Sequence, residues 1–335
     1  MSSIGVVVIG RNEGNRLKRS LLSVIKENIT VVYVDSGSTD NSVQLADSLG
    51  VNVIELDLSI PFTAARARNA GFFHLLQIKP DIEFVQFVDG DCVVVPGWLD
   101  IARSELKAAP DVVVVCGRRC EEFPGNSVYN LLCDVEWNTP IGEAKACGGD
   151  SMMRVAALQK VGGFNPTLIA GEEPELCVRL RREGGGVLRI NADMTLHDAK
   201  ILHLSQWWKR EIRNGHAYAE GMWLHGSSRD RHWVRESFRC WLWAFLLPLF
   251  AVIGSFPTRG LSLLLLLIAY NLLVVRVYFL AKNKGFNSKD SIRYGIFNGV
   301  LEKYPKLLGQ IQFFISKLLK RESRIVEYKN TVSAN

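Results

Sequence analysis

The stretch that decides the fold is Phe84-Val85-Gln86-Phe87-Val88-Asp89-Gly90-Asp91. Its apolar half is typical of a buried strand, and the acidic half places two carboxylates directly after that strand. In open α/β sheets, ligands bind outside the carboxyl ends of the strands. Paired carboxylates there suit Mg²⁺ or Mn²⁺, which can hold a diphosphate. Asp-Gly-Asp by itself also fits an ordinary surface turn, so its meaning depends on the rest of the chain.

Strand and helix patterns alternate on both sides of this motif. Apolar, β-branched runs predict strands at 4–9, 31–34, 51–56, 112–115 and 187–190. Helical spacing of apolar residues predicts helices between the first strands, over 64–76, from Trp98 to about Ala108, and over 176–183. This alternation predicts an α/β protein with a mostly parallel sheet and helices on both of its faces.

Composition narrows the class of protein. The 335 residues carry a formal net charge of +6, with the basic residues concentrated in the second half beside apolar stretches. That arrangement points to a membrane surface and away from nucleic acid. The chain starts without a basic, apolar leader, so the N-terminal domain is expected in the cytosol. The seven cysteines contain no Cys-x-x-Cys pair and are expected to be reduced.

Two apolar segments, 240–256 and 261–281, are separated by Pro257-Thr258-Arg259-Gly260. Both are long enough to cross a bilayer, the first only barely. Basic residues flank the pair and only Arg259 lies in the turn, so the positive-inside rule puts both flanks in the cytosol. A buried soluble hairpin is the poorer alternative. A re-entrant or interfacial hairpin stays open, because the first segment is short and contains Pro248.

A later helix pattern has one apolar and one polar face. Leu307, Leu308, Ile311, Phe314, Ile315, Leu318 and Leu319 form the apolar face, and the polar face holds Lys303, Lys306, Gln310, Lys317 and Lys320. This predicts an amphipathic helix on an anionic membrane, with packing against the catalytic domain as the alternative. The expected domains are a catalytic domain (1–225), a basic juxtamembrane segment (226–239), a membrane hairpin (240–281) and an interfacial helix with its tail (282–335).

Further polar residues follow the predicted strands. Glu13 lies after the first strand and Asp35 after the second, where a carboxylate can accept a hydrogen bond from a nucleotide. Asp40 is the expected N-cap of the next helix. Arg68 follows a helix start and is a candidate for phosphate binding, although a solvated helix face is the default interpretation.

The second half of this region supplies candidates for catalysis. Glu172 and Glu173 lie just before a predicted helix, where the helix dipole alone would favour acids, but one of them can take a proton from a hydroxyl acceptor. His197 follows a strand and is a candidate third metal ligand. Arg213 is a candidate phosphate clamp, with membrane contact as its alternative.

Together the motifs resemble family 2 glycosyltransferases with the GT-A fold, over roughly residues 4–220. The resemblance rests on the order of Arg11-Asn12-Glu13, Asp35-Ser36-Gly37-Ser38-Thr39-Asp40, Ala67-Arg68-Asn69-Ala70-Gly71, Asp89-Gly90-Asp91, Gly162-Gly163-Phe164 and Glu172-Glu173-Pro174-Glu175-Leu176. It implies an enzyme that moves a sugar from a nucleotide-sugar, with a UDP-sugar favoured, to a hydroxyl acceptor.

The resemblance also implies roles for individual residues. Glu173 takes the general-base position, with Glu172 as the alternative. The implied metal ligands for Mg²⁺ or Mn²⁺ are Asp91, Asp89 and His197. The implied nucleotide-sugar-binding residues are Glu13, Asp35, Arg68, Asp89, Gly149 and Arg213. The membrane segments imply a lipid-linked glycan acceptor in polysaccharide assembly.

Three positions depart from the family pattern. Gly10 and Arg11 stand where Pro and an aromatic residue are usual, Ser36 where a second Asp is common, and Glu173 where the base is usually Asp. Two other functions stay open on the sequence. A sugar-nucleotide nucleotidyltransferase would share the sheet and the metal carboxylates, and a non-catalytic nucleotide-sugar-binding membrane protein would share the binding residues.

Overall fold

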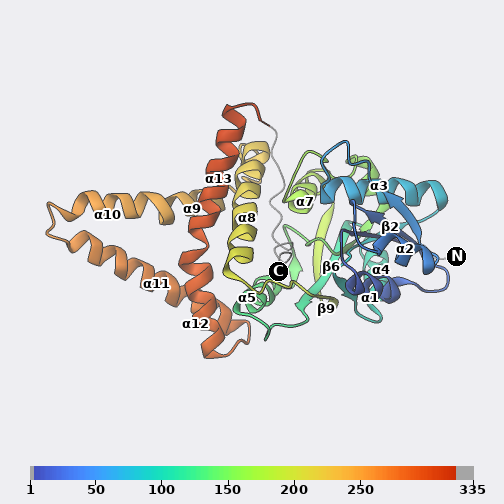
Figure 1. The fold of residues 1–335 in the computed structure, drawn as a ribbon, viewed down its shortest axis with the longest axis horizontal. Helices are drawn as coiled ribbons and strands as arrows, with labels where there is room; N and C mark the ends of the chain where they lie inside the picture. Colours follow the sequence, from blue (N-terminus) through green and yellow to red (C-terminus); the bar gives the residue numbers. More distant parts are fainter. Residues whose placement is uncertain (1–3, 322–335) are drawn as a thin grey trace. The chain divides into compact units, whose positions relative to one another are not determined.

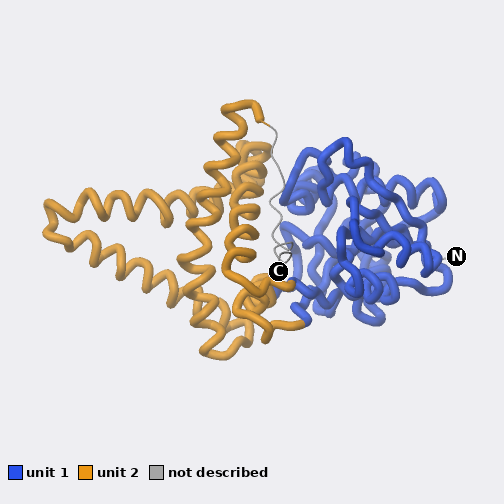
Figure 2. The backbone as a smooth tube through the Cα atoms, viewed as in Figure 1, with its two compact units in different colours: residues 1–122, 137–199 blue, residues 123–136, 200–335 orange. Residues whose placement is uncertain are grey.

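A computed structural model describes residues 4–321 and divides the chain into two compact units. Unit 1 comprises residues 1–122 and 137–199, and unit 2 comprises residues 123–136 and 200–335 (Figure 2). The tail of the predicted interfacial segment, residues 322–335, lies outside the described residues.

Unit 1 is built on a sheet with the strand order β3-β2-β1-β4-β8-β6-β9-β5, and β7 pairs with β9. Figure 1 labels β2, β6 and β9 of this sheet. The strands are β1 (Ile4–Gly10), β2 (Thr30–Asp35), β3 (Asn52–Glu55), β4 (Phe84–Asp89), β5 (Cys92–Val94), β6 (Val112–Glu121), β7 (Gly142–Glu143), β8 (Ser151–Arg154) and β9 (Gly186–His197). The predicted parallel arrangement is found from β3 to β4 and between β6 and β9. Strands β8, β5 and β7 add antiparallel pairs, so the sheet is mixed.

Helices accompany the strands in the order expected from the sequence. The helices of unit 1 are α1 (Asn15–Val24), α2 (Ser42–Ser48), α3 (Ala64–Ile78), α4 (Trp98–Ala108), α6 (Val155–Lys160) and α7 (Glu172–Arg182). Helix α7 begins four residues earlier than expected, so Glu172 and Glu173 lie in its first turn and not before it. The dipole favours acids there, and Pro174 is tolerated because first-turn N–H groups lack intrahelical partners. Asp40 accepts the Ser42 N–H at 3.0 Å, whereas the N-cap position itself is Asn41.

Two strands run further than their apolar cores predict. Strand β6 continues to Glu121 and β9 continues to His197, where both carry polar residues. Ladder hydrogen bonds between them hold these extensions, with register shifts along the pair. Short β5 and β8 have no independent periodic signal and form only by pairing with β9, β4 and β6. These extensions bring polar side chains to the edge where β4 ends.

Unit 2 is helical. Its elements are α5 (Val128–Trp137), α8 (Leu204–His225), α9 (Val234–Trp241), the π-helix η1 (Leu242–Leu246), α10 (Leu247–Ser255), α11 (Leu261–Asn283), α12 (Ser288–Ile296), the π-helix η2 (Phe297–Leu301) and α13 (Lys303–Leu318). The π-helical turns of η1 directly precede Pro248. Proline has no N–H to donate, and such a widened turn is a usual way for a helix to pass it.

Two helical stretches of unit 2, 234–255 and 261–283, are long and apolar enough to cross a membrane by length and composition. The stretch over 261–283 has none of its most apolar window buried in the structure. This exposure argues against the buried soluble hairpin, because a large exposed apolar surface marks a contact with a partner or a membrane.

Helix α13 differs from its predicted orientation. Lys306 and Gln310, which the sequence pattern places on a solvated face, are buried where α13 packs on α8 and α9. Leu308, Ile315 and Leu318 on the apolar face are exposed. The burial of Lys306 is compensated by Glu302 at 2.6 Å and Glu211 at 3.2 Å. A pattern of polar and apolar residues cannot reveal such a paired buried charge.

Candidate active site

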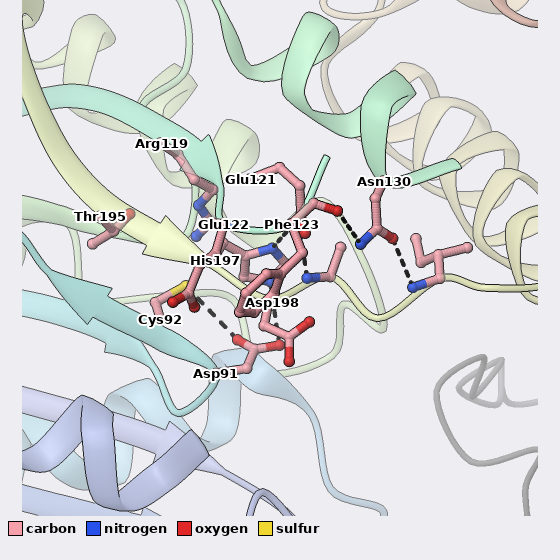
Figure 3. A network of polar contacts seen from close by, with 12 residues as sticks. Asp91, Cys92, Arg119, Glu121, Glu122, Phe123, Asn130, Thr195, His197 and Asp198 are labelled. Atoms are coloured by element: carbon pink, nitrogen blue, oxygen red, sulfur yellow. Dashed lines mark hydrogen bonds and ion pairs between the residues drawn. The ribbon is translucent and has the colours of Figure 1, made fainter. Parts of the chain in front are cut away.

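Asp91 and His197 face each other at the carboxyl edge of the sheet (Figure 3). Asp91 lies between β4 and β5, and His197 ends β9, opposite Cys92 in the antiparallel pair. The Asp91 Oδ2 and His197 Nε2 atoms are 3.2 Å apart, and both side chains are buried. Residues far apart in the chain therefore meet because β5 pairs with the extended end of β9.

Two further side chains surround the His197 ring. Its Nδ1 atom faces the Glu121 carboxylate at 3.8 Å, and the Trp137 ring packs edge-on with its centroid 4.7 Å away. Glu121 also accepts the Ala199 N–H at 3.1 Å. Glu121 is not among the residues predicted from the sequence. Its signal is the position of a carboxylate at the end of a strand that runs parallel to the His197 strand.

These residues fit a hard divalent cation. One ligand atom from each of Asp91, Cys92 and His197 lies within 4.8 Å of the others. Burial raises the pKa of the Cys92 thiol well above its ordinary value. Carboxylate oxygen is a harder donor than sulfur, so Asp91 with His197 suits Mg²⁺ or Mn²⁺ better than the thiol does. A carboxylate behind the other nitrogen of a metal-binding histidine is a common outer-shell partner, and Glu121 occupies that position.

Asp89 lies in a separate network of charges. Its Oδ1 accepts from Arg68 at 2.7 Å and its Oδ2 from Arg119 at 3.2 Å. Arg119 also pairs with the fully buried Asp150 at 2.7 Å, and Asp150 accepts the Asp89 N–H at 2.9 Å and the Thr195 hydroxyl at 2.8 Å. Asp89 also forms, with Cys92 and Asp150, a group whose ligand atoms could hold a metal ion. Its predicted roles in nucleotide-sugar binding and in metal binding therefore stay predictions.

The two arginines remain charged in this network. Burial alone would lower the pKa of Arg68, but the carboxylates of Asp89 and Glu172 outweigh it and raise the pKa above its ordinary value. Arg119 behaves in the same way, with Asp150 as its strongest partner. Arg68 was predicted to bind phosphate, and the structure places it inside the site instead of on a solvated helix face.

Gly149 lies against this network. A Cβ atom at Gly149 would come within 2.7 Å of the Arg68 Nη2 atom and 2.8 Å of the Asp89 Oδ2 atom. Contacts that close are not tolerated without displacement of the ion pairs. Glycine at this position therefore permits the close approach of the charged groups, while the predicted role of Gly149 in nucleotide-sugar binding stays a prediction.

The two adjacent glutamates point to different partners. Glu172 Oε1 accepts from Arg68 Nη1 at 2.6 Å, which connects it to Asp89. Glu173 Oε1 accepts the Cys147 N–H at 2.5 Å and also contacts the thiols of Cys147 and Cys177, each at 3.0 Å. One carboxylate is thus ion-paired in the charged network, whereas the other is oriented by a backbone amide and neutral thiols.

The remaining predicted residues lie at the first two strands and in unit 2. Asp35 is buried and accepts from Tyr33 and from the backbone of Gly37 and Ser38 at 2.7–2.9 Å, so it orders the turn after β2. Glu13 pairs with Arg16 at 2.6 Å. Arg213 lies on α8 of unit 2. The nucleotide-binding roles of these residues stay predictions.

The family comparison gives a direct result. Residues 5–160 match glycosyl transferase family 2. This segment contains Asp89, Asp91 and Gly149, and it ends before Glu173 and His197. The family predicted from the motifs is therefore confirmed over this segment of the chain.

A curated relative is also a glycosyltransferase. A pre-mycofactocin glycosyltransferase of Mycobacterium tuberculosis is 25% identical over 225 residues, which cover 63% of this chain and 46% of the relative. The chain thus spans about half the length of the curated relatives it matches.

Solved structures show that the fold is of the GT-A type. The mannosyltransferase PcManGT from Pyrobaculum calidifontis, in complex with GDP-Man and Mn2+, aligns with a TM-score of 0.63 and 16% identity over 94% of this chain and 88% of its own. Residues 1–349 of S. aureus TarS align with a TM-score of 0.50 and 13% identity over 99% and 98%.

Proposed function

We propose that this chain is an inverting, metal-dependent glycosyltransferase that moves a sugar from a nucleotide-sugar to a hydroxyl acceptor. The observation that carries the proposal is the buried Asp91–His197 pair beside the Arg68–Asp89 network at one edge of a family 2 fold. A UDP-sugar is the favoured donor, although the mannosyltransferase that resembles this chain is described with GDP-Man.

The donor is bound by residues around β1, β2 and β4. In this proposal Glu13 and Asp35 contact the nucleoside, and Asp89 and Arg68 hold the ribose and phosphate side of the donor beside Gly149. Asp91 and His197 would hold Mg²⁺ or Mn²⁺, whose positive charge stabilises a departing diphosphate. Mn2+ in the described complex of PcManGT supports this assignment. Arg213 stays a proposed phosphate-binding residue.

Glu173 is the proposed general base. The acceptor oxygen forms a bond to the anomeric carbon as the bond from that carbon to the diphosphate breaks, and Glu173 takes the hydroxyl proton. One displacement inverts the configuration at that carbon. The Cys147 amide and the two thiols hold Glu173 Oε1, which leaves Oε2 for the proton. Glu172 is the alternative base, but its Oε1 atom is already engaged in the ion pair with Arg68.

The acceptor is proposed to be a lipid-linked glycan in polysaccharide assembly. The two exposed apolar helices and their basic flanks support membrane attachment. In this arrangement the catalytic domain, proposed as residues 1–225, stays on the cytoplasmic side of the inner membrane. Attachment would concentrate the enzyme where a polyprenyl-diphosphate acceptor is anchored.

The first experiment measures Mn²⁺-dependent release of nucleoside diphosphate from a panel of nucleotide-sugars. It uses the full chain in lipid nanodiscs with extracted lipid-linked acceptors. The variants are Asp91→Ala, Glu173→Gln and Glu172→Gln, with Asp100→Ala on the exposed face of α4 as the control. We expect release with one donor, lost in Asp91→Ala and Glu173→Gln and kept in the control.

Other results discriminate among the alternatives. Loss in Glu172→Gln with activity kept in Glu173→Gln would move the base to Glu172. Pyrophosphate release from a nucleoside triphosphate would replace the proposal by a nucleotidyltransferase. Donor binding without release, with every acceptor offered, would favour a non-catalytic nucleotide-sugar-binding protein.

A further inference from the structure

The helical hairpin of unit 2 has an exposed apolar tip and an aromatic level at its base. Phe256 at the tip is 93% exposed, and Leu264 and Leu267 on α11 are also exposed. At the base, the Trp243 and Tyr270 rings lie 5.9 Å apart, and the Tyr270 hydroxyl bonds the Trp243 carbonyl at 2.7 Å. Tyr and Trp prefer the boundary between hydrocarbon and headgroups. This aromatic level therefore marks a natural membrane surface.

The part of the hairpin beyond the aromatic level is short. With a helical rise of about 1.5 Å per residue, Tyr270 lies about 14 Å along α11 from Leu261. By the same rise, Trp243 lies about 18 Å from Ser255 along the other arm. The hydrocarbon core of a bilayer is about 30 Å thick, so the projecting part reaches about as far as one leaflet.

Charged groups accompany the aromatic level. The Tyr270 hydroxyl is 3.1 Å from the Tyr304 hydroxyl on α13. Tyr304 directly follows Glu302 and Lys303, which pair with each other. If the hydrocarbon began at the tip and extended across a full bilayer, this level would lie near its centre, where ionised groups are costly.

Helix α12 also limits how deeply α11 can enter the hydrocarbon. It packs along the later half of α11, where Gly295 of α12 and Gly299 of the following η2 lie against Val274. Its Arg293 and Asp290 form an ion pair at 3.3 Å, and the Arg293 side chain is 43% exposed. Full insertion of α11 would draw this charged helix into the hydrocarbon. The single-leaflet arrangement places the exposed Arg259 near the bilayer centre, and full insertion places the exposed Arg276 in the hydrocarbon, so each arrangement carries the cost of one arginine.

We infer that the hairpin enters only one leaflet and returns, so that both arms and the tip belong to the same side of the membrane. The aromatic level of Trp243, Tyr270 and Tyr304 lies at the headgroups, and α12 lies in or above them. The inference rests on the proposed membrane association of the chain. The hairpin is then a monotopic anchor that contacts a single leaflet of the membrane.

The test uses the full chain reconstituted in vesicles of phosphatidylethanolamine and phosphatidylglycerol. Phe256→Cys places a reporter at the tip, Arg259→Cys is a second tip variant, and Asn283→Cys at the base is the matched control. Cysteine labelling by a membrane-impermeant maleimide is measured from outside, from inside and after detergent. The parent chain measures the background from its own cysteines. A nitroxide on the same cysteines reports depth through its relative accessibility to oxygen and to a nickel chelate.

A single-leaflet hairpin predicts that the tip cysteines are protected from both sides and become labelled only in detergent, while Asn283→Cys is labelled from the side that holds the enzyme. Labelling of the tip from the opposite side would overturn the inference and leave membrane association standing. Labelling of tip and base from the same side, or failure of the chain to remain with the vesicles, would overturn the proposed membrane association as well.

Discussion

At the scale of single residues, the candidate site depends on the groups that surround each proposed metal ligand. The Asp91 carboxylate faces the Nε2 atom of His197, and the Glu121 carboxylate faces its Nδ1 atom. A carboxylate in this position orients the imidazole ring of a metal-binding histidine. Glu121 is therefore a positioning residue, and its effect should appear in the affinity for metal before it appears in the rate.

Glu121→Gln tests this role. The amide keeps the size of the side chain and can still accept from Ala199, but it removes the negative charge behind His197. We expect the apparent affinity for Mn²⁺ to fall about 10–100-fold, with the rate at saturating Mn²⁺ close to that of the parent. Glu122→Gln, whose carboxylate pairs with Arg19 at the surface, is the control. An unchanged Mn²⁺ titration would remove Glu121 from the metal site.

Gly149→Ala tests the close approach of the charged groups. The added methyl group would come within 3.1 Å of Arg68, Asp89 and Arg119, so the ion pairs must separate. We expect an increased KM for the nucleotide-sugar and a loss of about 1–3 kcal/mol in the free energy of unfolding. Gly125→Ala is the control, because its Cβ atom would meet no atom within 4 Å. A KM equal to that of the parent would contradict the assigned role.

At the scale of elements, the packing of α8 against α13 depends on small residues and one buried ion network. Cβ atoms at Gly215 and Gly309 would each come within 2.0 Å of backbone oxygen atoms on the facing helix. This closeness buries Lys306 between Glu302 and Glu211. A buried charge with good partners contributes little net stability, but loss of one partner is costly.

Lys306→Met removes the shared cation. Glu302 and Glu211 would then lack their common partner, and we expect the free energy of unfolding to fall by about 3–5 kcal/mol. The matched control Lys317→Met, on the exposed side of α13, should change it by less than about 0.5 kcal/mol. Chemical denaturation of both variants in detergent measures the difference. Equal stabilities would show that the network does not hold α13 on α8.

The same network predicts an acid-sensitive stability. Burial alone would raise the pKa of Glu211, but Lys306 and Arg210 outweigh it, and the pKa in the folded chain lies below its ordinary value. A lowered pKa contributes stability above the unfolded value of about 4.3, and this contribution is lost as the pH falls through the folded value. The stability difference between the parent and Glu211→Gln should therefore narrow below about pH 4. A stability difference that does not change with pH would contradict the lowered pKa of Glu211.

At the scale of the whole molecule, the proposed catalysis on a lipid-linked acceptor would require the hairpin as well as the sheet. Leu264→Glu combined with Leu267→Glu places two charges on the exposed face of α11. We expect the chain to leave the membrane fraction and kcat/KM for the lipid-linked acceptor to fall, while donor affinity stays unchanged. Ile101→Glu, at an exposed apolar residue of unit 1, is the control and should stay with the membrane. Unchanged turnover after detachment would argue for a water-soluble acceptor.

Much of the architecture follows from local patterns in the sequence. The alternation of strands and helices, the carboxylates after β4 and the apolar hairpin depend on residues near one another in the chain, and each appears in the structure where the pattern predicts it. The short strand β8 and the polar extension of β9 do not follow from local patterns, because their backbone groups form hydrogen bonds with strands from distant parts of the chain.

The sequence by itself thus determined the family, the edge of the sheet that carries the site and the residue types available there. Only the tertiary structure decided that Glu121 faces His197, that Arg68 joins Asp89 to Glu172, and that Lys306 lies inside the helical unit. The physical reason is that a buried charge is stable only beside a partner of opposite charge. In these cases β-strand pairing and helix packing bring that partner from a distant part of the chain.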